Sequence, residues 1–487
     1  MKRSYAYILF PLAGMAFCLW YVCTATSDVV NSDYIRLVNS YLPDVWNPEK
    51  FFVADVLTRI PVNYLARILN VTFFDFSVRF DQILGILGLG LTGMAACAYA
   101  RKEGLGFLTM TAVTLLIFSL NKWEMLTNGS GWAHFLTFAG FYYYYLVLDR
   151  VWKAEMVLGG QADRKDRIRL MVLPFIITLC IAGQYCAIYS GVLIAVYGFL
   201  ALLPVLDRHF LKKETERPFW NRAVHSSGLP YIRYLLCILI PLALYMVSNA
   251  FTVEEHAGAT DLTLMQAIQE KPKFFPAFFM KSFASMFLGG ETMEQKFHFP
   301  NRLMLLIGLG VMAGYLLALW LNVKYRLYER TIFPLLLILS GGCSHVLILI
   351  SRWIFLDQEN YGMSSRYAVQ FQMGIIGIVL TAALVWKLEG KKLRLKRRFS
   401  SMLAAAFCCV IVAGNLVTTA DEIQKAPYRK DRYEEKVEAA LHYEDVSDED
   451  LERIFEYRKG PEKIRAALGI LKDNHWNVYS RYGGEEQ

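Results

Sequence analysis

The chain has 487 residues, of which 55% are hydrophobic, 14% aromatic and only 19% charged. Its mean hydropathy of +0.32 excludes a soluble globular protein of this length and is typical of a membrane protein with many spans. The net charge of +8 does not indicate nucleic-acid binding, because the basic residues lie in short clusters between apolar runs.

Apolar runs of about 17–23 residues recur along the chain, which is the length that a bilayer core of about 30 Å requires. The sequence therefore predicts an all-α polytopic membrane protein with about 11 transmembrane helices. Residues 170–206 are interpreted as two short spans. A re-entrant segment there would place every later loop on the opposite side of the membrane. The predicted spans lie at about 5–25, 82–100, 104–120, 132–148, 170–184, 188–206, 234–250, 303–321, 331–353, 368–386 and 401–419.

The charge of the loops predicts the orientation of these spans. Cytoplasmic loops of membrane proteins are rich in Lys and Arg, and the opposite loops of this chain are mixed or acidic. An odd number of spans then leaves the N-terminus in the cytoplasm and the C-terminal tail outside. The charged start at Met1 also fits a cleaved signal peptide, but its apolar run ends without a clear cleavage site, so we interpret it as the first span. The predicted inside loops are 101–103, 149–169, 207–222, 322–330 and 389–398.

Two regions outside the spans have a helical pattern. Residues 1–420 are predicted to form the transmembrane domain, and its long outer loop, 26–81, contains the amphipathic stretches "DYIRLVNSYL" and "PVNYLARILN", which we expect to lie on the membrane surface. Residues 421–487 are predicted to form a small external helical tail. In this tail, Ser447 and Pro461 occupy positions typical of helix starts.

Three carboxylates are candidates for acid–base chemistry. Asp28 follows the first span, where a solvated loop residue or a helix N-cap is the ordinary explanation. Asp33 begins the first amphipathic stretch, so its carboxylate is expected at the depth of the lipid head groups. Glu124 lies between apolar residues in "NKWEML" and is the third candidate.

Other polar residues at the predicted spans are candidates for binding. Gln184 and Tyr185 in "GQYCAIYSG" place hydrogen-bonding groups at membrane depth, which suits helix packing or a site for sugar hydroxyl groups. Arg366 and Tyr367 in "SSRYAVQ" precede the tenth span, and Arg352 lies on the span before it. An interfacial Arg can simply snorkel to water, or its guanidinium can bind phosphate through two hydrogen bonds.

This combination resembles the GT-C superfamily of membrane glycosyltransferases, which use sugars linked to polyprenyl phosphate. The resemblance rests on the Asp in a long first outer loop, the many spans, the "SRY" arginine and the outer C-terminal tail, and it covers the whole chain in architecture. It implies transfer of a sugar from a polyprenyl-phosphate carrier to an external glycan, polymer, lipid or protein acceptor. The resemblance implies that Asp33 is the general base. Asp28 stays an alternative, because this sequence lacks a pair of adjacent acidic residues in the first outer loop that would single out the base.

The resemblance also implies the remaining roles. Arg366, with Tyr367 and Arg352, would bind the donor phosphate, and substrate contacts are assigned to four further side chains, those of Gln184, Tyr185, Tyr34 and Arg36. The expected location is the bacterial plasma (inner) membrane, with membrane lipid as a partner and no nucleic acid. No cofactor is assigned, and dependence on a divalent metal stays open. The competing hypotheses are a transporter or flippase for a lipid-linked sugar or polymer, and a scaffold protein of the cell envelope.

Overall fold

The computed structural model describes residues 5–52, 60–206, 218–251, 259–390, 399–458 and 460–482. These residues form helices and contain no strands, so the predicted all-α class is confirmed for the described part of the chain. Two predicted basic loops, 207–222 and 389–398, lie mostly outside the described residues.

Eight of the described helices are long and apolar enough to cross a membrane. The chain is therefore a multi-pass membrane protein by the length and composition of its helices. The eight helices are α1 (Ala6–Ala25), α4 (Val78–Lys102), α9 (Cys186–Leu206), α11 (Leu229–Asn249), α14 (Asn301–Lys324), α15 (Phe333–Arg352), α16 (Ala368–Glu389) and α17 (Phe399–Leu441).

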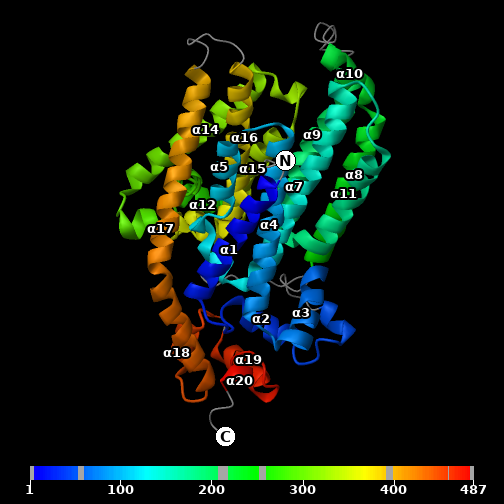
Figure 1. Cartoon of the computed structure of the whole chain (residues 1–487). Coiled ribbons are helices and arrows are strands. Elements are labelled where there is room, and N and C mark those ends of the chain that lie inside the picture. Colours follow the sequence, from blue (N-terminus) through cyan, green and yellow to red (C-terminus); the bar gives the residue numbers. More distant parts are fainter. Residues whose placement is uncertain are drawn as a thin grey trace.

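The other three predicted spans coincide with helices that are shorter or more polar. They are α5 (Phe107–Ile117), α7 (Trp132–Trp152) and α8 (Arg164–Phe175), and α8 continues as the π-helix η5 (Ile176–Ala182). All three pack inside the same bundle, α5 and α7 against α4 and α8 against α7 (Figure 1). The first turns of α8 carry the charged sequence "RKDRIR", which makes this helix more polar than the eight above.

Helix α16 forms the centre of the bundle, since 94% of its apolar window is buried. Its closest neighbour is α15, and the two backbones meet at glycines. A Cβ atom added at Gly341 would lie only 2.2 Å from the backbone nitrogen of Gly374, so the crossing excludes any side chain there. Small residues at helix crossings are the usual means of close packing in membranes.

The described residues between α1 and α4 pack together with the C-terminal tail at one end of the bundle (Figure 1). Both amphipathic stretches form the predicted helices, α2 (Asp33–Tyr41) and α3 (Pro61–Phe74). Helix α3 leaves Leu65 exposed, as a helix on a membrane surface does. The apolar face of α2 instead packs against α19 (Pro461–Asp473) of the tail, so protein rather than lipid covers that face.

Helix α17 runs without interruption for 43 residues, so the predicted boundary at residues 420 and 421 lies inside a helix. Beyond its apolar half the tail continues as α18 (Asp448–Ile454), α19 (Pro461–Asp473) and α20 (Val478–Arg481). The predicted helix starts are confirmed: the hydroxyl of Ser447 accepts a hydrogen bond from the backbone N–H of Asp450, and Pro461 is the first residue of α19.

Short helices join the long ones. Most of them lie between α5 and α7, between α11 and α14, and between α15 and α16. The short helices are η1 (Pro48–Phe52), η2 (Leu120–Lys122), α6 (Trp123–Thr127), η3 (Gly129–Gly131), η4 (Lys153–Val157), η6 (Gly183–Tyr185), α10 (Pro218–Ser226), α12 (Leu264–Glu270), α13 (Phe274–Ala284), η8 (Thr292–Lys296), η9 (Leu327–Glu329), η10 (Glu359–Met363) and η11 (Ser365–Tyr367).

Candidate functional site

A cavity of about 1030 Å³ is formed by segments that are far apart in the sequence. Its walls come from the α5–α7 connection, the α12–α13 segment with η8, the loop around η10, and α17 where the apolar half of that helix ends. Carboxylates are the commonest polar groups in the lining. They are Glu124, Glu270, Glu291, Glu294, Asp357, Glu359 and Glu422.

Two glycines let η8 approach its neighbours closely. A Cβ atom at Gly289 would lie 2.6 Å from Thr418 of α17, and one at Gly290 would lie 2.8 Å from the backbone oxygen of Met363. Any larger residue would separate these elements. The Gly-Gly pair therefore holds Glu291 and Glu294, which follow it directly, in the cavity wall.

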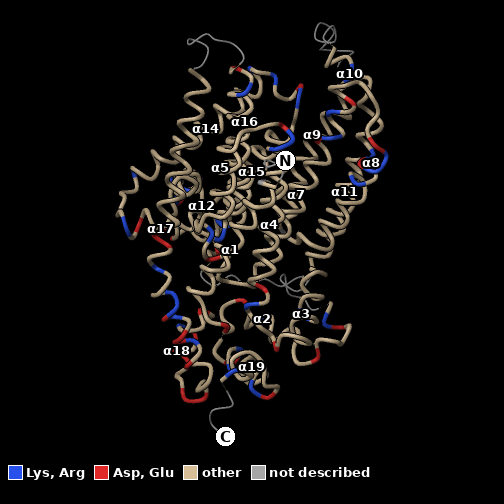
Figure 2. The backbone as a smooth tube through the Cα atoms, in the orientation of Figure 1, with Lys and Arg blue, Asp and Glu red and all other residues tan. Residues whose placement is uncertain are grey.

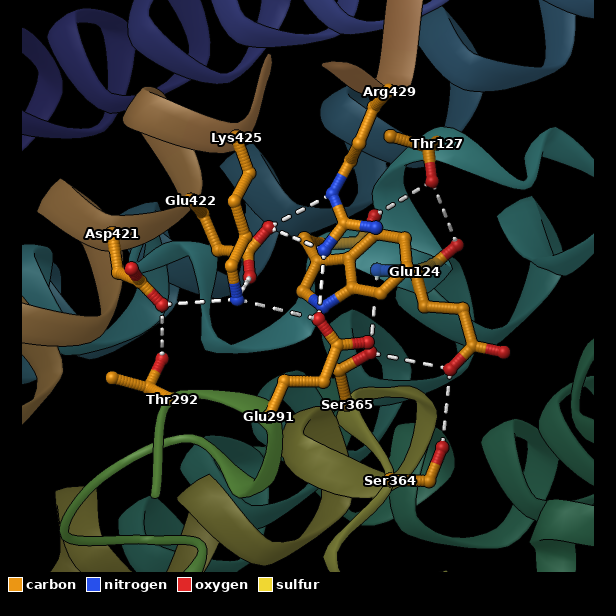
Figure 3. A network of polar contacts seen from close by, with 11 residues as sticks. Glu124, Thr127, Glu291, Thr292, Ser364, Ser365, Asp421, Glu422, Lys425 and Arg429 are labelled. Carbon is orange, nitrogen blue, oxygen red and sulfur yellow. Dashed lines mark hydrogen bonds and ion pairs between the residues drawn. The ribbon is translucent and has the colours of Figure 1, made fainter. Parts of the chain in front are cut away.

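One wall of the cavity is a network of ion pairs between α17 and η8 (Figure 3). Arg429 lies 2.8 Å from Glu422 and 2.9 Å from Glu291. Lys425 lies 3.0 Å from Asp421, which also accepts a hydrogen bond of 2.8 Å from the Thr292 hydroxyl group. Charged groups that are partly buried need such partners, and this network fixes the position of the Glu291 side chain at the cavity.

Trp123 extends this wall. The guanidinium of Arg429 stacks on the indole ring at 3.1 Å from the ring centroid, which is a cation–π contact. Trp123 is not among the candidates from the sequence, yet it lines the cavity. An aromatic face beside carboxylates is a surface on which the apolar side of a sugar ring can pack.

Glu124 and Arg366 are the two sequence candidates that the structure brings together. Arg366 donates to Oε1 of Glu124 through both Nε, at 2.9 Å, and Nη2, while the hydroxyl groups of Ser364 and Ser365 donate to Oε2 at 3.1 and 3.2 Å. Burial acts to raise the pKa of Glu124, but the charge of Arg366 and these hydrogen bonds outweigh burial and hold it below its ordinary value. Glu124 is therefore an ionised, fixed acceptor at neutral pH.

Glu294 is in a different electrostatic environment. It accepts a hydrogen bond from the side-chain amide of Asn360, and among the described residues no cation forms an ion pair with it. Burial raises the pKa of Glu294 above its ordinary value, and the opposing charge of Lys281 does not cancel this effect. A carboxyl group with these properties is suited to accept a proton.

The ammonium group of Lys281 lowers the pKa of Glu294 less than burial raises it, and its own hydrogen bonds and ion pair go to other residues. This lysine is only 1% exposed, and its Nζ lies 2.9 Å from Glu359 and 2.7 Å from the side-chain oxygen of Asn360. The ammonium group is thus directed at residues of η10. The ammonium group holds the loop around η10 in place, and the carboxylate of Glu294 remains available to the cavity.

Asp28 is buried away from this cavity, where it holds three segments together. Its carboxylate accepts hydrogen bonds from the Ser77 hydroxyl, at 2.5 Å, and from the first backbone N–H of α4, at Val78, at 2.6 Å. Arg481 of the tail forms an ion pair with it at 2.7 Å. These contacts resemble those of a helix-capping carboxylate and join α4 to the tail.

Asp33 lies in a second groove, of about 560 Å³, between α2 and the tail. It is 43% exposed and lies 3.9 Å from Arg36, the neighbouring candidate on the same helix. The groove shares no lining residue with the larger cavity, so the structure does not bring Asp33 together with Arg366.

The other predicted binding residues are dispersed. Tyr34 is fully buried and donates a hydrogen bond of 2.7 Å to Asp81, which also binds Arg67. The ring of Tyr185 lies 4.0 Å from that of His134 on α7, and the side chain of Gln184 lies outside the described residues.

Tyr367 and Arg352 flank the loop that forms part of the cavity. Tyr367 is buried, and its ring lies 5.9 Å from that of Tyr361, a residue of the cavity lining. Arg352 is the last residue of α15 and is partly buried. These two residues therefore support the loop that carries Arg366.

Sequence reasoning missed most of the cavity. One signal was available, because "DEIQKAPYR" directly after the last apolar run repeats charges at a spacing of three to four residues, which places them on one helix face. The Gly-Gly-Glu sequence at 289–291 was another. Within the described residues, no group of three or more His, Cys, Asp and Glu side chains is arranged to hold a metal ion.

The fold and the site define a multi-pass helical membrane protein with an acidic cavity at one end of its bundle. No protein-family model, curated protein or solved structure matches the chain. Its function must therefore be argued from the cavity itself.

Proposed function

We propose that the protein is a membrane glycosyltransferase that moves a sugar from a polyprenyl-phosphate carrier to an external acceptor, and that the reaction takes place in the acidic cavity. The observation that carries the proposal is that two unlike carboxylates line the same cavity: Glu124 is held ionised by Arg366, and Glu294 has a raised pKa. Unlike environments for neighbouring carboxyl groups are typical of acid–base catalysis.

The proposed topology counts α5, α7 and α8 with η5 as three further passes, which gives eleven. The helices α4, α7, α14 and α16 end at one end of the bundle, and α2, α3 and the tail lie at the other (Figure 1). Basic segments accompany the first end, as expected for a cytoplasmic side (Figure 2). The tail and the cavity would then face the outside of a bacterial plasma membrane.

In the proposed reaction, a hydroxyl group of the acceptor attacks the anomeric carbon of the sugar. Glu294 takes the hydroxyl proton as the new C–O bond forms, and the bond between the anomeric carbon and the phosphate oxygen breaks. The electron pair of that bond leaves with the polyprenyl phosphate. Positive charge develops on the sugar ring at this stage, and the fixed negative charges of Glu124 and Glu291 stabilise it.

This proposal changes the roles inferred from sequence. Arg366 already gives two of its nitrogen atoms to Glu124, so we assign it to holding that carboxylate rather than to the donor phosphate. Asp28 is assigned to the junction of α4 and the tail. Asp33 stays an alternative base, because it is exposed in its own groove.

The test is reconstitution of the purified protein with a radiolabelled polyprenyl-phosphate sugar and a set of acceptors. We expect a labelled product together with free polyprenyl phosphate, and strongly reduced product with Glu124→Gln. Glu438→Gln, an exposed position on α17, is the matched control. Movement of intact donor across the bilayer without any release of polyprenyl phosphate would instead favour the transporter or flippase hypothesis.

A further inference from the structure

Helix α12 exposes an apolar face beside the cavity. Thr263 and Gln266 cap each other at its start, which fixes a short helix at this position. Leu264, Met265 and Ile268 lie on one side of that helix and are 48%, 66% and 42% exposed. On a protein surrounded by water, such a face would be covered by another protein or would promote aggregation.

Lipid is the occupant that the surroundings indicate. Helix α13 follows α12 and packs on the membrane helix α14. Near its start α14 also exposes the apolar side chains of Leu303 and Leu306. A short helix with an apolar face on such a surface is an interfacial helix, lying at the boundary between head groups and acyl chains.

Two lysines stand between this helix and the cavity. Lys271 and Lys273 are exposed and line the cavity directly after α12 ends. Lys271 lies 2.5 Å from Asp357, but both side chains are exposed, and such pairs exchange readily for other partners. Among the described residues, none forms an ion pair with Lys273.

We propose that α12 is the membrane-side entrance of the cavity and that Lys271 and Lys273 bind the phosphate group of a lipid that enters there. The acyl or prenyl chain stays in the bilayer against Leu264, Met265 and Ile268, while the phosphate meets the two ammonium groups at the cavity rim. The identification of this lipid as a polyprenyl phosphate rests on the proposed function. The lipid-phosphate site rests on the helix and the lysines alone.

Other cations near the cavity are less suitable for this role. Arg366 is engaged by Glu124, and Arg429 is shared between Glu291 and Glu422. Lys281 is buried and directed at Glu359. Because an arriving phosphate would have to compete with carboxylates for each of these, the exposed lysines are the cations that can bind it at the smallest cost.

The experiment measures equilibrium binding of a radiolabelled long-chain polyprenyl phosphate to the purified full-length protein in neutral detergent micelles. With Lys271→Ala and Lys273→Ala combined, we expect the dissociation constant to rise by roughly tenfold or more. Lys463→Ala, an exposed lysine on α19, should leave binding unchanged. The uncharged polyprenol should bind weakly to all forms and show no dependence on the lysines.

Two results would overturn the inference. One is equal binding of polyprenyl phosphate by the double variant and the unchanged protein. The other is displacement of the probe by inorganic phosphate at equal concentration, which would indicate a site for free phosphate. A second measurement does not depend on the folding of a variant. In neutral nanodiscs, a photoreactive phosphatidylcholine should label the peptide 264–270 of the unchanged protein. Absence of that label would contradict an interfacial α12.

The outcome is separable from that of the sugar-transfer assay. Binding of polyprenyl phosphate that depends on the lysines, without any sugar transfer, would support the entrance and remove the glycosyltransferase proposal. Sugar transfer together with binding that does not depend on the lysines would support the glycosyltransferase proposal and remove the entrance.

Discussion

Two clusters of charged residues lie outside the apolar parts of the spans, and they differ in what surrounds them. Asp81, Arg67 and Tyr34 form a fully buried group that joins α2 and α3 to α4. The carboxylates Glu124 and Glu294 line a cavity of about 1030 Å³. Asp81 is paired with Arg67 and Glu124 with Arg366, but only Glu124 and Glu294 line space that a substrate can occupy.

The difference separates structural from functional carboxylates. A buried acid whose oxygen atoms are all taken by protein donors stabilises one conformation and cannot reach a substrate. Glu294, beside the cavity, accepts a hydrogen bond from Asn360 at Oε1, whereas protein donors take both oxygen atoms of Glu124, so Glu294 is the cavity acid suited to proton transfer. The comparison predicts that substitutions in the buried cluster reduce stability, whereas those in the cavity reduce turnover.

Arg67→Met should have the largest effect on stability. It leaves the Asp81 carboxylate buried with Tyr34 as its remaining donor, and losing one partner of a buried ion pair costs about 3–5 kcal/mol in the free energy of unfolding. The measurement is denaturant unfolding in a fixed detergent. The double variant Arg67→Met, Asp81→Leu should recover much of the loss, and a single variant as stable as the unchanged protein would contradict the structural role.

Asp28→Asn should have a smaller effect of the same kind. The change removes the charge that pairs with Arg481 and weakens the hydrogen bonds from Ser77 and Val78, so we expect a loss of about 1.5–3 kcal/mol. Unfolding and sugar transfer should both be measured. If transfer falls strongly while stability is unchanged, Asp28 is catalytic and the comparison between the two clusters fails.

Trp123→Leu tests the aromatic wall of the cavity. It removes the ring under Arg429, and a partly buried cation–π contact contributes about 0.5–2 kcal/mol. We expect a raised KM for the sugar acceptor or donor with a modest change in kcat. Trp476→Leu, in the tail, is the control, and equal effects of the two changes would argue against a role for Trp123 in binding.

The pH dependence of transfer distinguishes the two cavity carboxylates. A base acts in its ionised form, and burial raises the pKa of Glu294 above 4.5. The rate of sugar transfer should therefore be highest at higher pH and fall as the pH drops through that raised pKa. The pKa of Glu124 is lowered, so its titration falls below this limb. An acid limb centred below 4.5 would point to Glu124 as the base.

Much of the architecture could be predicted from sequence because the bilayer imposes strong rules. Long apolar runs and the helix signals at Ser447 and Pro461 depend on local chemistry, and the structure contains the corresponding helices. The covering of α2 by α19 could not be predicted, because an amphipathic face carries no information about whether lipid or protein covers it.

The candidate site was less accessible to sequence reasoning. Glu124 and Arg366 were both candidates, but their mutual ion pair joins residues far apart in the chain. Glu294 has no distinctive local pattern. Its environment arises from the close approach of Gly289 to α17 and of Gly290 to Met363, and from Asn360 on another loop, contacts that appear only in the folded chain.

The central claim is that Glu294, in the cavity, takes the proton from the acceptor. Its most direct test is sugar transfer from a polyprenyl-phosphate donor by purified Glu294→Gln, Asp33→Asn and Glu438→Gln at matched amounts of folded protein. General-base catalysis contributes roughly 10²–10⁴-fold, so Glu294→Gln should lose that factor while the other two keep turnover close to that of the unchanged protein. Near-normal turnover by Glu294→Gln, together with loss of turnover in Asp33→Asn, would contradict the account.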